Sequence, residues 1–308
     1  MPHHDRGDVV ARRGLAVLVA IAAIAASFVV PAAAARLRIV YTNDLHARLE
    51  RLASAAEVIA ATRAAGDPVL LLDGGDAWQD FRVPVYAVWG ADSVVEWMNR
   101  TGYDAQALGN HDVYPGWPSV RALAAQAAFP VLAANLRPID GSMPPFAGST
   151  RIARGGLDIL IVGLATLEQL PWFDIPWLRL HDPVDALRRE IEAAAGSPDL
   201  FVCVAHVPLW QAEIIAAAVP EVDVFVTGHS HAATLTPRIV GQTLLVQSGA
   251  FAHYVGVLVV DVEDGGVRLV GHTLVPTQEE AATDIGRGLV RLAQIALGIL
   301  AFSVLLVL

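Results

Sequence analysis

The stretch 37-LRIVYTNDLH-46 decides the fold, because a short apolar run is followed at once by side chains that can bind a cation. The apolar run 37–41 ends at the polar residues 42–44, which predicts a buried strand that runs into a loop. Asp44 and His46 lie in that loop with one residue between them. On an extended turn this spacing points both side chains to the same side, so the pair can converge on one centre.

Outward from this stretch, apolar runs and helical spacing alternate along the chain. Further strands are predicted at 69–72, 104–108, 131–134, 200–205 and 224–227. Helices are predicted from residue 49 to the stop at 66–68, at 85–99, at 119–128 and at 183–195. After residue 231 only strands are expected, at 243–247, 254–262 and 267–275. This order predicts an α/β domain in which two packed sheets carry helices on their outer faces.

Polar side chains follow five of these strands, at the edge where α/β sheets bind ligands. They are Asp44 with His46, Asp76, Asn110 with His111, His206, and His229 with His231. One such histidine on its own is usually a capping or core residue. The whole set offers oxygen and nitrogen donors that suit Mn, Zn, Fe, Ca or Mg, and burying it without cations would be costly.

The motifs that contain these residues resemble those of the 5′-nucleotidase-type calcineurin-like metallophosphoesterases. The matching segments occur in family order across nearly the whole interior; they are LRIVYTNDLHARL (37–49), DGGDAWQ (73–79), YDAQALGNHD (103–112), FPVLAANL (129–136), VAHVPL (204–209), DVFVTGHSH (223–231) and LVQSGAFAHYVG (245–256). The resemblance implies the metallo-dependent phosphatase fold, a four-layer α/β/β/α sandwich of two mixed sheets flanked by helices.

The resemblance also implies a site for two divalent metal ions, of Mn, Zn, Fe, Ca, Co or Mg. Asp44, His46 and His231 would hold the first ion, Asp76 would bridge, and Asn110, His206 and His229 would hold the second ion. Two ions activate a water molecule for attack on phosphorus, so a hydrolase of a small phosphomonoester or diester is expected. Asn110, His111 and Arg48 are the expected substrate contacts.

His111 is the expected catalytic residue, because the family places it over the leaving oxygen. The family motif GNHEFD continues here as Gly-Asn-His-Asp-Val-Tyr, so Tyr114 stands where the acid that orients the histidine is usual. Asp112 is the expected catalytic substitute, with Asp80 as the alternative.

A second departure concerns the carboxyl-terminal domain with which family nucleotidases bind the base. This chain has an apolar tail at that point, so the resemblance does not extend to nucleotide specificity. A non-catalytic or very slow metal-binding module of the same fold therefore stays open, as does a hydrolase of a lipid-linked or sulfur-oxyanion substrate.

Both ends of the chain are apolar. Residues 1–35 predict a cleaved signal peptide, with an uncleaved anchor as the alternative, and therefore an exported or periplasmic protein. Residues 36–278 form the expected metallophosphoesterase domain. Residues 289–308 contain a charge-free run and predict a membrane anchor, with an apolar helix on the domain or in the interface as the alternative. Arg287 and Arg291 oppose the anchor by the positive-inside rule.

Composition excludes several classes. Hydrophobic residues make up 55% of the 308 residues and charged residues 17%, so the chain is no disordered or charged linker. The net charge is −10, which argues against nucleic acid as a partner. Cys203 is the only cysteine, which excludes an internal disulfide framework and a cysteine-rich metal site. The expected partners are a small phosphorylated substrate and the membrane.

Overall fold

The computed structural model describes residues 35–79, 84–114, 116–142, 146–166, 178–263 and 266–278, with the backbone alone for 84–89. These residues belong to a compact unit that begins at Ala35. The predicted signal peptide up to residue 34 and the tail 289–308 lie outside the described residues, and so does Asp80. Within the described part of the chain, no helix is long and apolar enough to cross a membrane.

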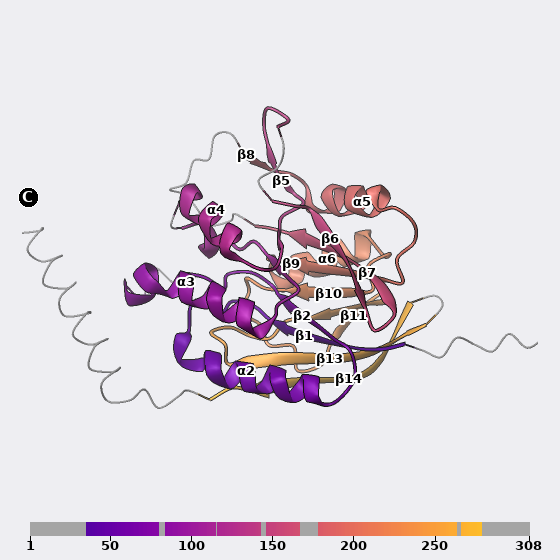
Figure 1. The fold of residues 1–308 in the computed structure, drawn as a ribbon. Coiled ribbons are helices and arrows are strands. Elements are labelled where there is room, and N and C mark those ends of the chain that lie inside the picture. The colour runs from indigo at the N-terminus through magenta and orange to yellow at the C-terminus, as the bar shows by residue number, and fades with distance from the viewer. Residues whose placement is uncertain are drawn as a thin grey trace, which may run out of the picture. The chain divides into compact units, whose positions relative to one another are not determined.

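The first sheet has six strands in the order β14-β13-β1-β2-β3-β4 (Figure 1). Its strands are β1 (Ala35–Thr42), β2 (Val69–Asp73), β3 (Ala105–Ala107), β4 (Val131–Leu132), β13 (Tyr254–Glu263) and β14 (Gly266–Pro276). β1 to β4 run parallel, and β13 pairs antiparallel with both β1 and β14. The sheet is therefore mixed.

The second sheet also has six strands, in the order β11-β12-β10-β9-β7-β6. Its strands are β6 (Ser149–Arg154), β7 (Leu157–Leu164), β9 (Leu200–Ala205), β10 (Val224–Thr227), β11 (Arg238–Val240) and β12 (Thr243–Val246). β7, β9, β10 and β12 run parallel, and β6 and β11 close the two edges antiparallel. A separate two-stranded ribbon pairs β5 (Leu136–Pro138) with β8 (Leu178–Leu180).

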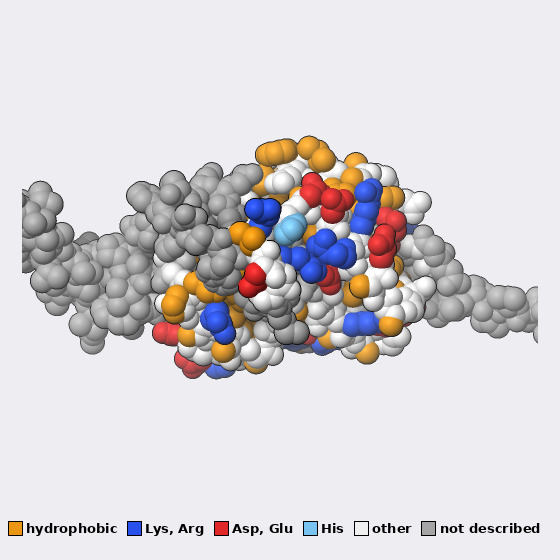
Figure 2. All heavy atoms as spheres, turned by 90° about the horizontal axis from the view of Figure 1, so that it is seen from above, with side chains coloured by type: hydrophobic (Ala, Val, Ile, Leu, Met, Phe, Trp, Pro, Cys, Tyr) orange, Lys and Arg blue, Asp and Glu red, His pale blue; other side chains and the backbone are white. Residues whose placement is uncertain are grey.

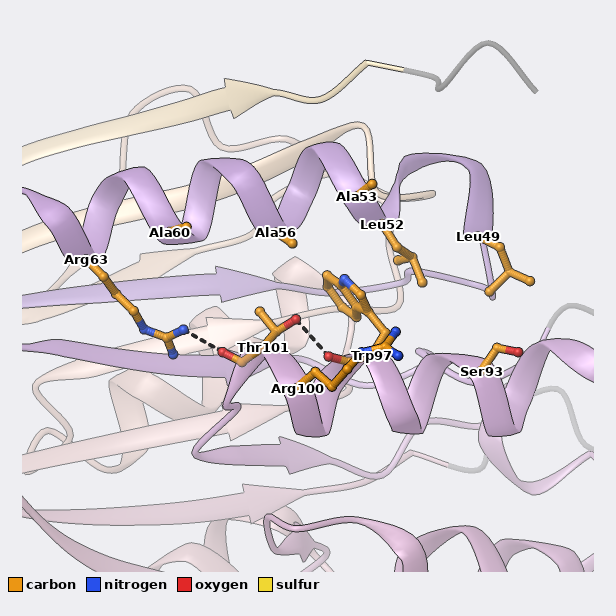
Figure 3. A pocket seen from close by; sticks show the side chains of 10 residues that line it. All are labelled: Leu49, Leu52, Ala53, Ala56, Ala60, Arg63, Ser93, Trp97, Arg100 and Thr101. Carbon is orange, nitrogen blue, oxygen red and sulfur yellow. Dashed lines mark hydrogen bonds between the residues drawn. The ribbon is translucent and has the colours of Figure 1, made fainter. Parts of the chain in front are cut away.

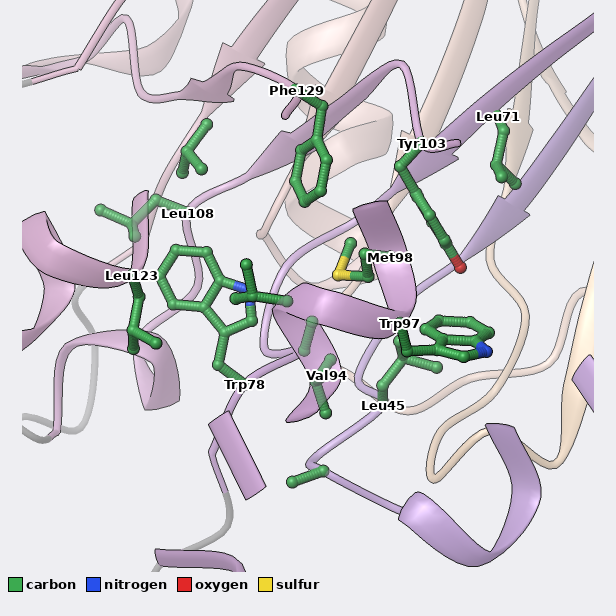
Figure 4. Packing of buried hydrophobic residues seen from close by; sticks show 14 of the residues in the cluster. Leu45, Leu71, Trp78, Val94, Trp97, Met98, Tyr103, Leu108, Leu123 and Phe129 are labelled. Carbon is green, nitrogen blue, oxygen red and sulfur yellow. The ribbon is translucent and has the colours of Figure 1, made fainter. Parts of the chain in front are cut away.

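Helices cover the outer face of each sheet. α2 (Leu49–Ala64), α3 (Pro84–Thr101) and α4 (Trp117–Gln126) belong to the first sheet, and α5 (Pro183–Ala193) and α6 (Leu209–Ala218) belong to the second (Figure 1). One buried cluster joins α2–α4 to the first sheet through Trp78, Trp97 and Met98 (Figure 4). A second cluster fills the space between the sheets, and a third lies under α5 and α6. The predicted four-layer α/β/β/α sandwich is confirmed.

The alternation of faces along β1 shows how the sequence builds these layers. Leu37, Ile39 and Tyr41 point into the inter-sheet cluster, whereas Val40 points toward the helices. Successive side chains of a strand point to opposite faces, and both faces of this strand are covered, which explains why it reads as a nearly continuous apolar run.

Helix α6 was missing from the sequence prediction. Its residues LWQAEIIAAA place apolar side chains on the exposed face as well as on the buried face, so no apolar stripe with helical spacing marks it. Ala212, Ile215 and Ala216 pack under the second sheet, while Trp210 and Ile214 are 59% and 58% exposed.

The surface mixes charges of opposite sign. On the face shown in Figure 2, arginine and acidic side chains lie beside one another, and hydrophobic side chains gather along one edge. Ion pairs join Arg151 to Asp158 and Arg137 to Glu190. Such exposed pairs add little stability, about 0–1 kcal/mol each.

Candidate metal centre

The polar loops that follow β1, β2, β3, β9 and β10 meet at one edge of the sandwich. The first three strands run parallel in one sheet and the other two run parallel in the second sheet. Their carboxyl ends therefore face the same region from both sheets. All seven of the residues expected to bind metal, from Asp44 to His231, contribute atoms to this region.

The first group of donors comes from the β1 and β10 loops. Donor atoms of Asp44, His46 and His231 all lie within 4.8 Å of one another. His46 Nε2 lies 3.1 Å from His231 Nε2 and 3.8 Å from Asp44 Oδ1. His46 Nδ1 lies 3.1 Å from the carbonyl of Gln79, which favours the tautomer with the proton on Nδ1. Nε2 is then unprotonated and can bind a cation. Burial also lowers the pKa of His46, which favours the neutral imidazole that a cation requires.

The second group of donors combines loops of both sheets. Donor atoms of Asp76, His206 and His229 lie within 4.8 Å of one another. The side-chain oxygen of Asn110 lies 3.1 Å from both His206 Nε2 and His229 Nδ1. His206 Nδ1 lies 2.9 Å from the carbonyl of Gly74, which leaves Nε2 as the metal-facing atom.

Asp76 lies between the two groups. Its Oδ2 is 3.1 Å from His206 Nε2, and its donor atoms also group with His46 and His111. Burial raises the pKa of this carboxyl, but the charge and hydrogen bond of His206, together with the charges of His46 and His111, outweigh burial and bring the pKa below its ordinary value. Conversely, burial disfavours protonation of His206, yet Asp76 raises the pKa of His206 to about 10. A buried carboxylate between two groups of imidazoles is suited to bridging two cations.

The backbone of these loops is held in a strained form. Asp44, His46, Asp76, His229 and His231 all have φ between 49° and 69°, in the left-handed region. Such residues cost about 1–2 kcal/mol each and cluster at functional sites. Several backbone hydrogen bonds couple the β1 loop to the β2 loop, among them those from the amide of Asp44 to the carbonyl of Gly75 and from the amide of His46 to the carbonyl of Asp76.

Two glycines let the loops approach one another. A Cβ on Gly109 would lie 2.1 Å from Asp76 Oδ1, and a Cβ on Gly75 would lie 2.8 Å from His206 Nδ1. Atoms cannot approach so closely without moving. The absence of a side chain at these two positions therefore permits the spacing of the donors.

Asp112 is fully buried, and its carboxylate holds loops together. Oδ1 accepts from the amide of Trp78, and Oδ2 accepts from the amides of Asp76 and Gly109 and from the side chain of Gln106. Burial and the neighbouring Asp76 raise the pKa of Asp112 to about 7. These hydrogen bonds direct the Asp112 carboxylate to the loops of Asp76 and Gly109, and its expected role as a partner of His111 stays a prediction.

His111 begins a short 3₁₀ turn, His111–Val113, at the same edge of the sandwich. Its amide donates to Asp76 Oδ1 at 2.7 Å. Its imidazole packs edge-on against the ring of His46, with centroids 4.7 Å apart. His111 therefore lies beside His46 of the first group and Asp76, and its catalytic role stays a prediction.

Arg48 lies near the first group, with its guanidinium carbon 4.8 Å from the centre of the Phe251 ring. Phe251 also packs against His46 and His231, with centroids 5.3 and 5.0 Å apart. Its amide donates to the carbonyl of Asp44. Phe251 was missed by the sequence analysis. Its place inside the segment 245–256 was the available signal, because this segment follows a strand at the same edge.

Asn43 is a second residue that the sequence analysis missed. Its side-chain nitrogen donates to Asp44 Oδ2 at 2.7 Å and to the carbonyl of Gly249, while its oxygen accepts from both the amide and the hydroxyl of Ser248. It thereby fixes one carboxylate oxygen of Asp44. No pattern in the sequence separates this role from that of an ordinary loop asparagine.

A hollow of about 600 Å³ lies elsewhere, between α2 and α3 (Figure 3). Leu52, Ala56 and Trp97 line it, and Arg63 at one end donates to the carbonyl of Thr101. None of the residues that line this hollow belongs to the metal centre.

Comparisons with known proteins agree with this geometry. The family model for the calcineurin-like phosphoesterase domain matches residues 37–233, which is more than half of the chain. The chain therefore belongs to the calcineurin-like phosphoesterase family, as its motifs predict.

Individual relatives point to the same family. The chain is 28% identical over 235 residues to the uncharacterized metallophosphoesterase YunD of Bacillus subtilis, which covers 74% of this chain and 50% of that protein. It is 30% identical over 285 residues to a snake venom 5′-nucleotidase of Gloydius brevicauda, which covers 78% and 48%. The chain thus spans about half the length of these relatives.

Among solved structures, a 5′-nucleotidase precursor of Thermus thermophilus superposes with a TM-score of 0.70 at 22% identity. The match covers 87% of this chain and 59% of that structure. At this identity the likeness shows the fold.

Proposed function

We propose that this protein is an exported hydrolase of small phosphoric esters that depends on two divalent metal ions. The single observation that carries the proposal is the position of Asp76, whose buried carboxylate lies between two groups of nitrogen and oxygen donors. Family membership supports the same reaction class. The identity of the ions is left open among Mn, Zn, Fe, Ca, Co and Mg.

The assignment of ligands follows the two groups. Asp44, His46 and His231 would hold one ion, and Asn110, His206 and His229 would hold the other, with Asp76 shared between them. In both His46 and His206, Nδ1 contacts a backbone carbonyl, and this contact orients Nε2 toward the proposed ion. Such partners raise the basicity of the ligand and orient it.

Two bound metal ions would lower the pKa of a water molecule and supply positive charge for the phosphoryl oxygens. The chain's own groups then position the ester. Arg48, whose guanidinium lies over the ring of Phe251 beside the first group, is proposed to contact the phosphoryl oxygens. His111, beside both groups, is proposed to donate a hydrogen bond or a proton to the oxygen of the leaving group. Asp112 is proposed to act indirectly, by positioning Asp76, because its carboxylate accepts a hydrogen bond from the amide of Asp76.

The substrate is proposed to be a phosphomonoester or diester of low molecular mass. The snake venom relative is named a 5′-nucleotidase, which makes nucleoside monophosphates reasonable first compounds for a screen. This chain spans about half of that relative, so specificity for nucleotides is not part of the proposal.

The ends of the chain complete the proposal. Residues 1–35 are proposed to direct export and 289–308 to anchor the domain, 36–278, at the outer face of the membrane. The apolar composition of both ends supports this arrangement.

Asp76→Asn tests the proposed reaction in the full-length purified protein. Bound metal is counted, and turnover is measured with aryl phosphate monoesters and diesters. We expect two ions in the wild type, a lower count in the variant, and a loss of turnover of about a thousandfold or more. Asp67→Asn, outside the metal centre, is the matched control and should keep both metal and turnover. Full metal occupancy without turnover of any ester by the wild type would favour the non-catalytic module.

A further inference from the structure

The imidazole of His111 lies between two other rings. One is His46, edge-on at 4.7 Å between centroids and 77° between planes. The other is Tyr114, at 4.5 Å and 75°. Aromatic pairs favour this edge-to-face arrangement because the positive edge of one ring meets the negative face of the other. Both contacts therefore restrain the direction in which the imidazole points.

The local backbone produces the contact with Tyr114. Residues 111–113 form a 3₁₀ helix, and the amide of Tyr114 donates to the carbonyl of His111 at 3.2 Å. Side chains three residues apart eclipse one another in a 3₁₀ helix. The ring at position 114 is thus placed against the ring at position 111 by the turn itself.

The neighbouring carboxylate has other partners. Asp112 accepts hydrogen bonds from three backbone amides and from Gln106, which direct both of its oxygens toward the loops of Asp76 and Gly109. The side chain that the structure packs directly against His111 from within its own turn is that of Tyr114.

We propose that Tyr114 is a positioning residue that holds the imidazole of His111 toward the reaction centre by ring packing, in place of a carboxylate. The role rests on the proposed function of His111. It needs the aromatic ring and does not need the hydroxyl. Tyrosine adds no negative charge beside the imidazole, so its contribution is to orientation alone.

Kinetics of the full-length, metal-loaded protein test this role with Tyr114→Phe and Tyr114→Leu. Phenylalanine keeps the ring and should keep kcat within about twofold of the wild type. Leucine removes the ring and should lower kcat by about three- to tenfold with KM unchanged, the size expected for one aromatic contact. The loss should be greater for esters with poor leaving groups, because these depend most on His111.

A double variant separates positioning from general damage. If Tyr114 acts through His111, adding Tyr114→Leu to His111→Ala should cause no further loss, because the ring that Tyr114 holds is already gone. Equal losses in the phenylalanine and leucine variants would overturn the proposal, and so would a further loss in the double variant or wild-type kcat in Tyr114→Leu.

A spectroscopic readout stands apart from activity. The imidazole resonances of His111, identified by their disappearance in His111→Ala, should shift more than those of any other histidine when Tyr114 becomes leucine. Tyr114→Phe should leave them nearly in place, since it preserves the ring current. If the wild type turns over no ester, the proposed function fails while this experiment still decides the packing. An unmoved His111 resonance in Tyr114→Leu would overturn the positioning role.

Discussion

The two donor groups of the candidate metal centre, called its two halves below, are built differently. The half around His206 and Asn110 is closed: these side chains are essentially unexposed, and glycines allow backbone to pack directly on the donors. The other half is open at one donor: Asp44 and His46 are buried, but the side chain of His231 is 35% exposed and the ring of Phe251 packs against it. The closed half therefore depends on close backbone packing around all of its buried donors, whereas water can reach the open half at His231.

Among the substitutions that compare the two halves, Gly109→Ala should have the largest effect, because it displaces the backbone of the closed half. The added Cβ would lie 2.1 Å from Asp76 Oδ1 and 2.3 Å from its amide nitrogen, so the Asp76 loop must move. A misplacement of about 1 Å can lower turnover roughly a hundredfold. Turnover and bound metal are measured together. Gly271→Ala, with open space around it, is the control and should resemble the wild type. Normal turnover in Gly109→Ala would show that the closed half is less rigid than its packing implies.

Removing one histidine from each half should lower the free energy of unfolding of the metal-free protein by different amounts. His206→Ala leaves the buried Asp76 without its 3.1 Å partner and should lower the free energy of unfolding by about 3–5 kcal/mol. His231 lies at the open side, where water can replace the imidazole, so His231→Ala should lower the free energy of unfolding by about 1 kcal/mol or less. Urea unfolding after chelation measures both values. Equal losses would remove the distinction between the halves.

The closed half should also make the stability of the chelated protein depend on pH. The pKa of His206 in the folded protein is about 10, above its ordinary value near 6.5. Its stabilisation is therefore complete below pH 6.5 and is lost as the pH rises toward 10, by on the order of 1.4 kcal/mol per pH unit. Urea midpoints across this range should fall in the wild type and fall less in His206→Ala.

His272→Asn is the control for that pH series. This histidine lies on β14, and its pKa is lowered by partial burial, so it titrates below the range tested. The variant should keep the wild-type slope. A wild-type midpoint that does not change between pH 6.5 and 10 would contradict the proposed Asp76–His206 pair.

Phe251→Leu should have the smallest effect, since it alters only the wall of the open half. The ring contacts of His46 and His231 are lost, while the donor atoms themselves remain. We expect affinity for one ion to fall by about two- to tenfold, with the other ion unaffected. Titration of the chelated protein with metal measures the two affinities, and Leu235→Ala, at a residue that is 78% exposed, serves as the control. Weakening of both ions equally would show that the ring supports the whole centre.

The sequence predicted the strands of the interior well, because their apolar runs are short and end at polar loops. β9 and β10 were predicted with their observed bounds. Helix α6 was not predicted, because its apolar residues lie on both the buried and the exposed face and form no single stripe. Strand ends predicted that the polar clusters meet at one edge, whereas the grouping of Asp44 with His231 came from the family resemblance; the structure brings these two side chains together.

Other features of the centre could not be predicted from one sequence. The left-handed backbone at five of the proposed ligands depends on hydrogen bonds between loops that are far apart along the chain. The burial of Asp112 under three amides likewise depends on tertiary packing. Composition and spacing report which donors are present, but they do not report which amide each carboxylate faces.

Two donors of the first group, His46 and His231, lie far apart along the chain, and this separation has a consequence for biosynthesis. His46 and His231 touch across 185 residues of sequence. Ribosomes add about 5–20 residues per second, so roughly 10–40 s pass between the synthesis of the first and the last of these donors. During that interval His46, Asp44 and Asp76 have been synthesised, but the set of donors around them is incomplete. If the proposed cations bind, they would therefore bind at the end of folding, in the compartment where the last strand pairs.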